Sequence, residues 1–145
     1  MRVMALDIGD KRIGIAVSDP TGLLASAERV LKRASLAKDL AALAAIVEEH
    51  EAEAVVVGMP LHLDGREGEQ EQVVRRFTER LKQRLSVPVV YWDERLSTVG
   101  AQKLLIEVGL SPSARAARLD AAAAAVILQS YLDYQRGMRT RGTEE

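Results

Sequence analysis

Short apolar segments separated by turn residues characterise the first third of the chain. Residues 2–8 and 12–18 are mostly apolar and flank a turn around residues 9–12, a pattern that predicts a β-hairpin. A third strand is expected at residues 24–32, because the turn sequence Asp19-Pro20-Thr21-Gly22 lies just before it. Together these segments predict an antiparallel meander.

The remainder of the chain alternates between helical and strand-like patterns. Apolar residues recur at helical spacing after the capping residue Ser35, whereas Val55-Val56-Val57 is typical of a buried parallel strand. Helices are expected at 35–50, 69–85, 97–109 and from 111–119 to about Arg136, and strands at 53–58 and 87–92. The order βββαβαβαα predicts an α/β fold with a mixed five-stranded sheet flanked by helices.

The length of the chain limits its domain organisation. Residues 1–136 should form a single domain, since 145 residues suffice for one core but not for two substantial ones. Residues 137–145 are polar and are expected to form a loose C-terminal tail. Residues 59–68 contain proline and glycine, so we expect a loop that either closes over a substrate or only connects its neighbours.

Composition restricts the chemistry that the chain can support. Apolar residues make up 48% of the chain, as in globular proteins, and no cysteine is present to form a disulfide or a thiolate site. His50 and His62 are isolated in the sequence, which disfavours zinc and leaves oxygen ligands for any metal. Without a signal-peptide pattern or a membrane-length apolar run, we expect a cytoplasmic protein with no membrane partner. The net charge of -1 argues weakly against a nucleic-acid binder.

Three acidic residues lie where a strand ends or a helix begins. Asp7 follows the apolar residues 3–6, and Glu94 comes just after the strand expected at 87–92. Asp120 precedes a run of five alanines and shares a helical face with Ile127, which should pack on the sheet. Because burying a lone carboxylate is costly, each of these positions needs an explanation.

Each carboxylate also has a purely structural explanation. Asp7 could cap a turn, Glu94 could pair with Arg95 or cap the next helix, and Asp120 could be a favourable acid in a first helical turn. If the three converge, their repulsion requires a cation, and oxygen ligands favour Mg²⁺ or Mn²⁺. Asp7, Glu94 and Asp120 would then be both metal ligands and catalytic residues of phosphodiester cleavage.

Basic residues lie near each of these acids in the sequence. Lysine and arginine hold phosphates in place without reading the base sequence. The candidates for binding nucleic acid are Lys11, Arg12, Arg95, Arg115 and Arg118. Exposure to solvent explains any one of them equally well, and it is the default for Arg115.

Four segments match a known family, in order along almost the whole chain. They are Leu6-Asp7-Ile8-Gly9 and the residues up to 19, Val57-Gly58-Met59-Pro60-Leu61 with Asp64-Gly65, Asp93-Glu94-Arg95-Leu96-Ser97-Thr98, and residues 119–132 from Leu119-Asp120-Ala121 onward. These segments resemble the YqgF family of pre-16S rRNA nucleases, which are also described as Holliday junction resolvase-like.

The resemblance implies a ribonuclease H-like fold and a metal-dependent nuclease that processes the 5′ end of pre-16S rRNA during ribosome biogenesis. The acidic positions of the family correspond to Asp7, Glu94 and Asp120. Structured RNA or branched DNA would be the substrate, and ribosomal particles a further partner. Ala123 stands where resolvases of this fold usually carry another acid or histidine, so the site has three protein carboxylates.

Other functions remain open from the sequence. A Holliday junction resolvase in DNA recombination or repair would use the same acids. A non-catalytic RNA-binding factor in ribosome assembly would need none of them. Asp7-Ile8-Gly9 also resembles the first phosphate loop of actin-like and sugar-kinase-like proteins, but those folds hold nucleotide between two domains and this chain supplies one.

Overall fold

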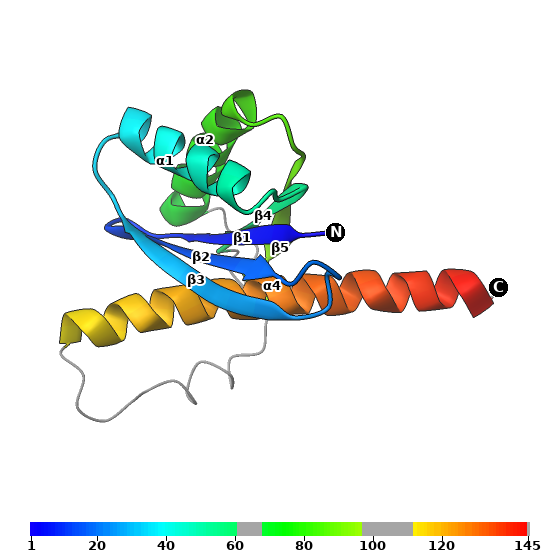
Figure 1. The fold of residues 1–145 in the computed structure, drawn as a ribbon. Coiled ribbons are helices and arrows are strands. Elements are labelled where there is room, and N and C mark those ends of the chain that lie inside the picture. The colour runs from blue at the N-terminus through cyan, green and yellow to red at the C-terminus, as the bar shows by residue number, and fades with distance from the viewer. Residues whose placement is uncertain (61–67, 97–111, 145) are drawn as a thin grey trace.

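A computed structural model describes the backbone of residues 1–60, 68–96 and 112–144, and the side chains of these residues except 112–117 and 138–144. Five strands form one mixed sheet, with helices on both of its faces (Figure 1). The predicted fold class is therefore confirmed. The helix expected at 97–109 and most of the loop expected at 59–68 lie outside the described residues.

The first three strands form the predicted meander. They are β1 (Val3–Ile8), β2 (Arg12–Ser18) and β3 (Ala25–Lys32), and both neighbouring pairs are antiparallel. The Gly9 amide donates a hydrogen bond of 2.9 Å to the Arg12 carbonyl and closes the first turn. This tight turn fixes the register, in which Asp7 lies directly opposite Gly14.

The following elements extend the sheet on the other side of β1. They are α1 (Leu36–Glu49), β4 (Ala54–Met59), α2 (Glu69–Arg84) and β5 (Val89–Asp93), and the sheet order is β3-β2-β1-β4-β5. The pairs β1–β4 and β4–β5 are parallel, so α1 and α2 are crossover helices. Ser35 caps α1 as predicted, because its hydroxyl accepts a hydrogen bond from the Lys38 amide.

Alternating side chains of the central strands divide the core into two halves. One half contains Met4, Leu6, Val55 and Val57 together with apolar residues of α1 and α2. The other half lies between the sheet and the last helix, and its members include Val3, Ala5, Ala16, Ala54, Val56, Ile127 and Leu128. The sheet is therefore covered on both faces, with α1 and α2 on one and α4 on the other (Figure 1).

The last helix, α4 (Pro112–Glu144), is longer than the sequence predicted. It continues through residues 137–144, where a loose tail was expected, and its end projects beyond the sheet (Figure 1). No proline follows Pro112, and Gly137 weakens a helix by only about 1 kcal/mol, so polar composition alone does not end it. No helix in the described part of the chain is long and apolar enough to cross a membrane.

Candidate active site

Asp7 lies near the end of the central strand β1, with its side chain on the face that α4 covers. The in-phase residues Val3 and Ala5 pack in the core half beneath α4, and side chains two apart on a strand share a face. Neighbouring Leu6 and Ile8 belong to the opposite core half. The apolar strand thus delivers one carboxylate to the interface between the sheet and α4.

Gly14 allows α4 to approach this point. It is the cross-strand partner of Asp7, and a Cβ atom added to it would lie 2.0 Å from the Asp120 carbonyl oxygen. The helix backbone therefore rests directly on the sheet, a contact that only glycine permits. Alanines 121, 122 and 124 are buried at this contact, and Asp120 is brought to the strand that pairs with Asp7.

Glu94 reaches the same face from the end of β5. It begins the short 3₁₀ helix η1 (Glu94–Leu96), immediately after the strand. A Cβ atom at Gly58 would lie 2.9 Å from Glu94 Oε1 and 2.6 Å from Ile127 Cδ1. The missing side chain at Gly58 on β4 therefore leaves the space that Glu94 occupies.

The electrostatics of Asp7 and Glu94 show that the two carboxyl groups share one environment. The pKa of Asp7 is raised to about 6, first by burial and then by the charge of Asp120, whereas a hydrogen bond with Glu94 opposes the shift. The pKa of Glu94 is raised to about 7, first by burial and then by the charge of Asp7 and the same hydrogen bond. In this arrangement Glu94 keeps the proton and donates it to Asp7.

Asp120 has a different partner. The Arg12 Nε atom donates a hydrogen bond of 2.6 Å to Asp120 Oδ2, and the two side chains are about one third exposed, 35% and 32%. The predicted phosphate-binding residue Arg12 therefore pairs with a predicted metal ligand. This ion pair offsets the negative charge on the side of the site that faces β2.

The other predicted cations lie in different settings. Lys11 is exposed in the first turn, and Arg118 is exposed on α4. Arg95 lies against Asp93, with its Nε atom 3.0 Å from both carboxylate oxygens and Nη2 2.8 Å from Oδ2. The side chain of Arg115 lies outside the described residues.

Sequence reasoning missed the two glycines that make room for the acids. Gly14 and Gly58 each interrupt an otherwise apolar strand, which is the pattern of a close approach by another backbone or side chain. That pattern was available in the sequence. The Arg12–Asp120 pair joins residues 108 positions apart, and no local signal indicates it.

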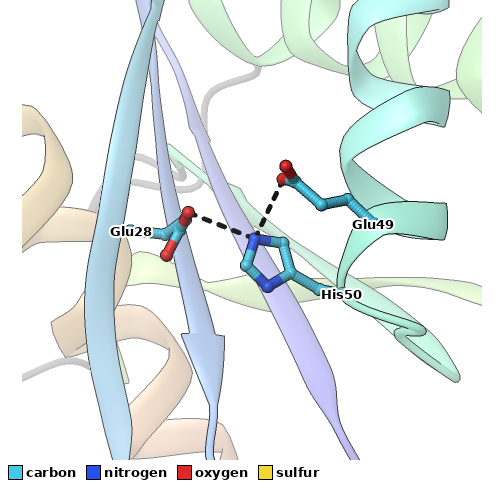
Figure 2. Close-up of side chains that lie close together, drawn as sticks. All are labelled: Glu28, Glu49 and His50. Atoms are coloured by element: carbon cyan, nitrogen blue, oxygen red, sulfur yellow. Dashed lines mark ion pairs between the residues drawn. The ribbon is translucent and has the colours of Figure 1, made fainter.

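A second acidic group lies away from these residues, between β3 and the end of α1 (Figure 2). Within the described part of the chain, Glu28, Glu49 and His50 form the one group of three whose ligand atoms all lie within 4.8 Å of one another. Asp7, Glu94 and Asp120 are not gathered this tightly. His50, which is isolated from other histidines in the sequence, lies with its Nε2 atom 3.1 Å from Glu28 Oε1 in the fold.

Arg29 already occupies this second group. Its Nη2 atom donates to Glu28 Oε1 at 2.8 Å and to Glu49 Oε2 at 2.5 Å, the same oxygens that lie near His50. The cluster therefore ties β3 to the end of α1 through an ion-pair network. Asp7, Glu94 and Asp120 remain the candidate active site, because their carboxyl groups come from three elements and interact at one end of the sheet.

Comparison with known proteins places the chain in a family. A model of the RuvX family, described as Holliday junction resolvase, matches residues 1–134. A protein of Desulforamulus reducens is 47% identical over 133 residues, covering 92% of this chain and 97% of that protein. A protein of Myxococcus xanthus is 48% identical over 136 residues, covering 94% and 90%. Both are named "Putative pre-16S rRNA nuclease".

Solved structures with the same fold include two resolvases. RuvC of Thermus thermophilus in complex with a Holliday junction has a TM-score of 0.62 at 18% identity, covering 94% of this chain and 96% of that one. The Fowlpox virus resolvase in complex with junction DNA has a TM-score of 0.57 at 14% identity, covering 93% and 99%. At such low identity these structures establish the fold alone. The match over residues 1–134 and the close relatives show that the chain belongs to the RuvX family, the YqgF group that its four motifs resemble.

Proposed function

We propose that this chain is a metal-dependent nuclease that hydrolyses phosphodiester bonds while processing the 5′ end of pre-16S rRNA. The observation that carries the proposal is the interacting set of Asp7, Glu94 and Asp120, delivered by β1, η1 and α4 to one end of the sheet. Relatives 47% and 48% identical, named as pre-16S rRNA nucleases, support the choice of RNA substrate.

The three carboxyl groups fit a divalent cation. Their donor atoms are all oxygen, which suits Mg²⁺ or Mn²⁺. The raised pKa values of Asp7 and Glu94 show that their fully ionised state is unfavourable in the protein alone. A cation would offset that repulsion, so Asp7, Glu94 and Asp120 are the residues that would hold it.

The chain's own residues prepare this site in three ways. The sheet–helix interface leaves Asp7 and Glu94 only partly exposed to water, and the elements that carry them hold them on one face of the sheet. With a cation bound, Asp7 and Glu94 would both be ionised, and the proton that they share would pass to solvent. Asp120 would then bind the cation, and the Arg12 guanidinium beside it would be available to a phosphate.

The bound metal would supply Lewis-acid stabilisation of the charge that develops on the phosphate oxygens during hydrolysis. The protein contribution is then mostly positioning, through Arg12 beside Asp120 and the exposed Lys11 in the adjacent turn. We propose Arg95, Arg115 and Arg118 as further contacts to the nucleic acid. Because such contacts do not read bases, we expect the shape of the RNA to decide where it is cut.

The test is cleavage of a labelled pre-16S 5′ leader by the purified protein with Mg²⁺ or Mn²⁺. Asp7→Asn and Asp120→Asn should each reduce the rate at least about a hundredfold, since each removes a charged ligand. Glu53→Gln is the matched control, because Glu53 is an exposed acid just before β4 and should leave the rate unchanged. Cleavage that survives Asp7→Asn would assign the activity to another site or to a contaminant.

A second candidate is a Holliday junction resolvase, favoured by the description of the family model. Ala123 argues against it, because this position, one turn after Asp120, offers no fourth ligand. Symmetric cuts in a four-way DNA junction, faster than cuts in the RNA leader, would favour the resolvase. Tight RNA binding with no metal-dependent turnover would instead indicate a non-catalytic assembly factor that acts on ribosomal particles.

A further inference from the structure

We infer that a basic recess beside the candidate active site, lined by Lys11, Arg12 and Lys32, binds a phosphate that flanks the scissile one, with Lys32 as its main contact. The inference rests on the proposed nuclease function and adds a substrate-binding residue to it. Lys32 is the last residue of β3 and belongs to none of the four family-like motifs.

The recess is an open hollow of about 620 Å³ where β2 begins and β3 ends, at the open end of the β2–β3 hairpin. Its charged lining residues are Asp10, Lys11, Arg12, Lys32 and Arg33, with Val30 and Ala34 completing the wall. Four of the five charges are positive. The volume falls within the range of sites for small ligands, so the recess can admit a phosphate with its sugar.

Two of these cations are already neutralised. Arg33 donates from Nε to Asp39 Oδ2 at 3.1 Å and from Nη1 to the Gly9 carbonyl at 3.1 Å, so it forms a fixed part of the wall. Arg12 is paired with Asp120. Lys11 and Lys32 are exposed, and the described residues offer no hydrogen bond or ion pair to either side chain.

The register of the sheet places Lys32 next to a like charge. Arg12 and Lys32 are directly opposite each other on β2 and β3, so their side chains share a face. Like charges in this arrangement destabilise a sheet. Asp120 compensates Arg12, whereas Lys32 forms no ion pair with Asp10 or another described acid, and an anionic ligand between Arg12 and Lys32 would remove the repulsion.

The same register links the recess to the candidate active site. Asp7, Gly14 and Val30 form one row across β1, β2 and β3, and Val30 also lines the recess. Arg12 and Lys32 form the next row on the same face, about 7 Å further along the strands. Lys32 also lies two strands from Asp7, about 10 Å across the sheet, so its long side chain would reach a phosphate that flanks a scissile phosphate at Asp7.

The test measures binding separately from cleavage. In an Asp7→Asn background, affinity for a labelled single-stranded RNA of the pre-16S 5′ leader is measured from low to high salt. Lys32→Ala should raise the Kd about three- to tenfold at low salt and make the slope of log K against log salt shallower by about 0.7, the loss of one phosphate contact. Lys32→Arg should retain the wild-type slope.

Lys38→Ala is the matched control, because Lys38 is an exposed lysine on α1, which covers the opposite face of the sheet. Lys32→Glu adds a readout that a loss of folding could not imitate. It should weaken RNA binding further while raising the Tm of the metal-free protein, because the new carboxylate pairs with Arg12 across the strands.

Equal Kd values and equal salt slopes for Lys32→Ala and Lys38→Ala would overturn the inference, whether or not the protein cleaves RNA. A failure of the nuclease proposal looks different, because cleavage would be absent while the salt slope still depended on Lys32. In the cleaving wild-type background, Lys32→Ala should raise KM and leave kcat nearly unchanged, since Lys32 lies beside the reacting phosphate and not at it.

Discussion

Two glycines, Gly14 and Gly58, shape the candidate site as much as the acids do. Asp120 can lie near Asp7 only because Gly14 lets the backbone of α4 rest on β2. Glu94 can turn back over the sheet only because Gly58 leaves room for it. We therefore predict that a side chain at either glycine damages the site.

Gly14→Ala tests this directly. The added methyl group would lie 2.0 Å from the Asp120 carbonyl oxygen, so α4 must shift away from the sheet. We expect the free energy of unfolding to fall by about 2 kcal/mol or more, with loss of cleavage. The measurements are urea unfolding and the leader assay.

Gly137→Ala is the control for that substitution. An added methyl group there meets nothing within 4 Å, and alanine favours a helix over glycine. Stability should therefore rise slightly, by up to about 1 kcal/mol, with unchanged cleavage. If Gly14→Ala behaved in the same way, α4 would not rest on β2 as described.

The raised pKa values of Asp7 and Glu94 predict how the stability of the protein depends on pH. Folding raises their pKa values from 3.8 and 4.5 to about 6 and about 7, so the folded protein binds more protons than the unfolded chain across this window. The stability of the metal-free protein should therefore fall as the pH rises from about 4 to 8.

Asp7→Asn should remove much of this dependence. It should raise the Tm of the metal-free protein by a few degrees at pH 8 and by less at pH 5, because it eliminates one of the repelling charges. Mg²⁺ should raise the Tm of the wild type at pH 8 but not that of the variant. A wild type that becomes more stable over the whole rise in pH would refute this assignment of the proton.

Among the elements, helix α4 both packs in the hydrophobic core and carries one of the three candidate acids. Its residues from Ala121 to Leu132 form one half of the core with the sheet, and Asp120 begins this packed stretch. The position of the carboxylate therefore depends on apolar contacts up to three turns away. The packing of this helix and the proposed catalytic role of Asp120 are therefore expected to be coupled.

Leu128→Ala measures this coupling. Leu128 is fully buried, so its truncation should reduce the free energy of unfolding by about 2–5 kcal/mol and also slow cleavage. Leu24→Ala is the control, because Leu24 is 65% exposed and should change stability by less than about 0.5 kcal/mol. Unimpaired cleavage in a clearly destabilised Leu128→Ala protein would show that packing and site are independent.

Periodicity predicted most elements well, because burial imposes it on the chain. The strands β1, β2 and β4 lie within a residue of their expected ends, since strands buried on both faces leave nearly unbroken apolar runs in the sequence. The end of α4 was predicted wrongly, because a polar helix that leaves the sheet carries no such pattern. The pairing of Arg12 with Asp120 depends on how α4 crosses the sheet, which periodicity does not encode.

At the scale of the whole molecule, charge distribution matters more than net charge. The chain carries a net charge of -1, yet the partly buried acids and the basic recess lie next to each other at one end of the sheet. A cation at the acids and phosphates along the recess would complement each other. This juxtaposition explains how a nearly neutral protein can serve a polyanionic substrate.

The central claim is that Asp7, Glu94 and Asp120 hold a divalent cation together. The direct test is Mn²⁺ binding by calorimetry to the wild type and to Asp7→Asn, Asp120→Asn and His50→Ala. We predict that both aspartate variants bind at least about tenfold more weakly, because each loses a charged oxygen ligand, whereas His50→Ala binds like the wild type. Unchanged binding in the aspartate variants, or its loss in His50→Ala, would place the metal at the other cluster and contradict the account.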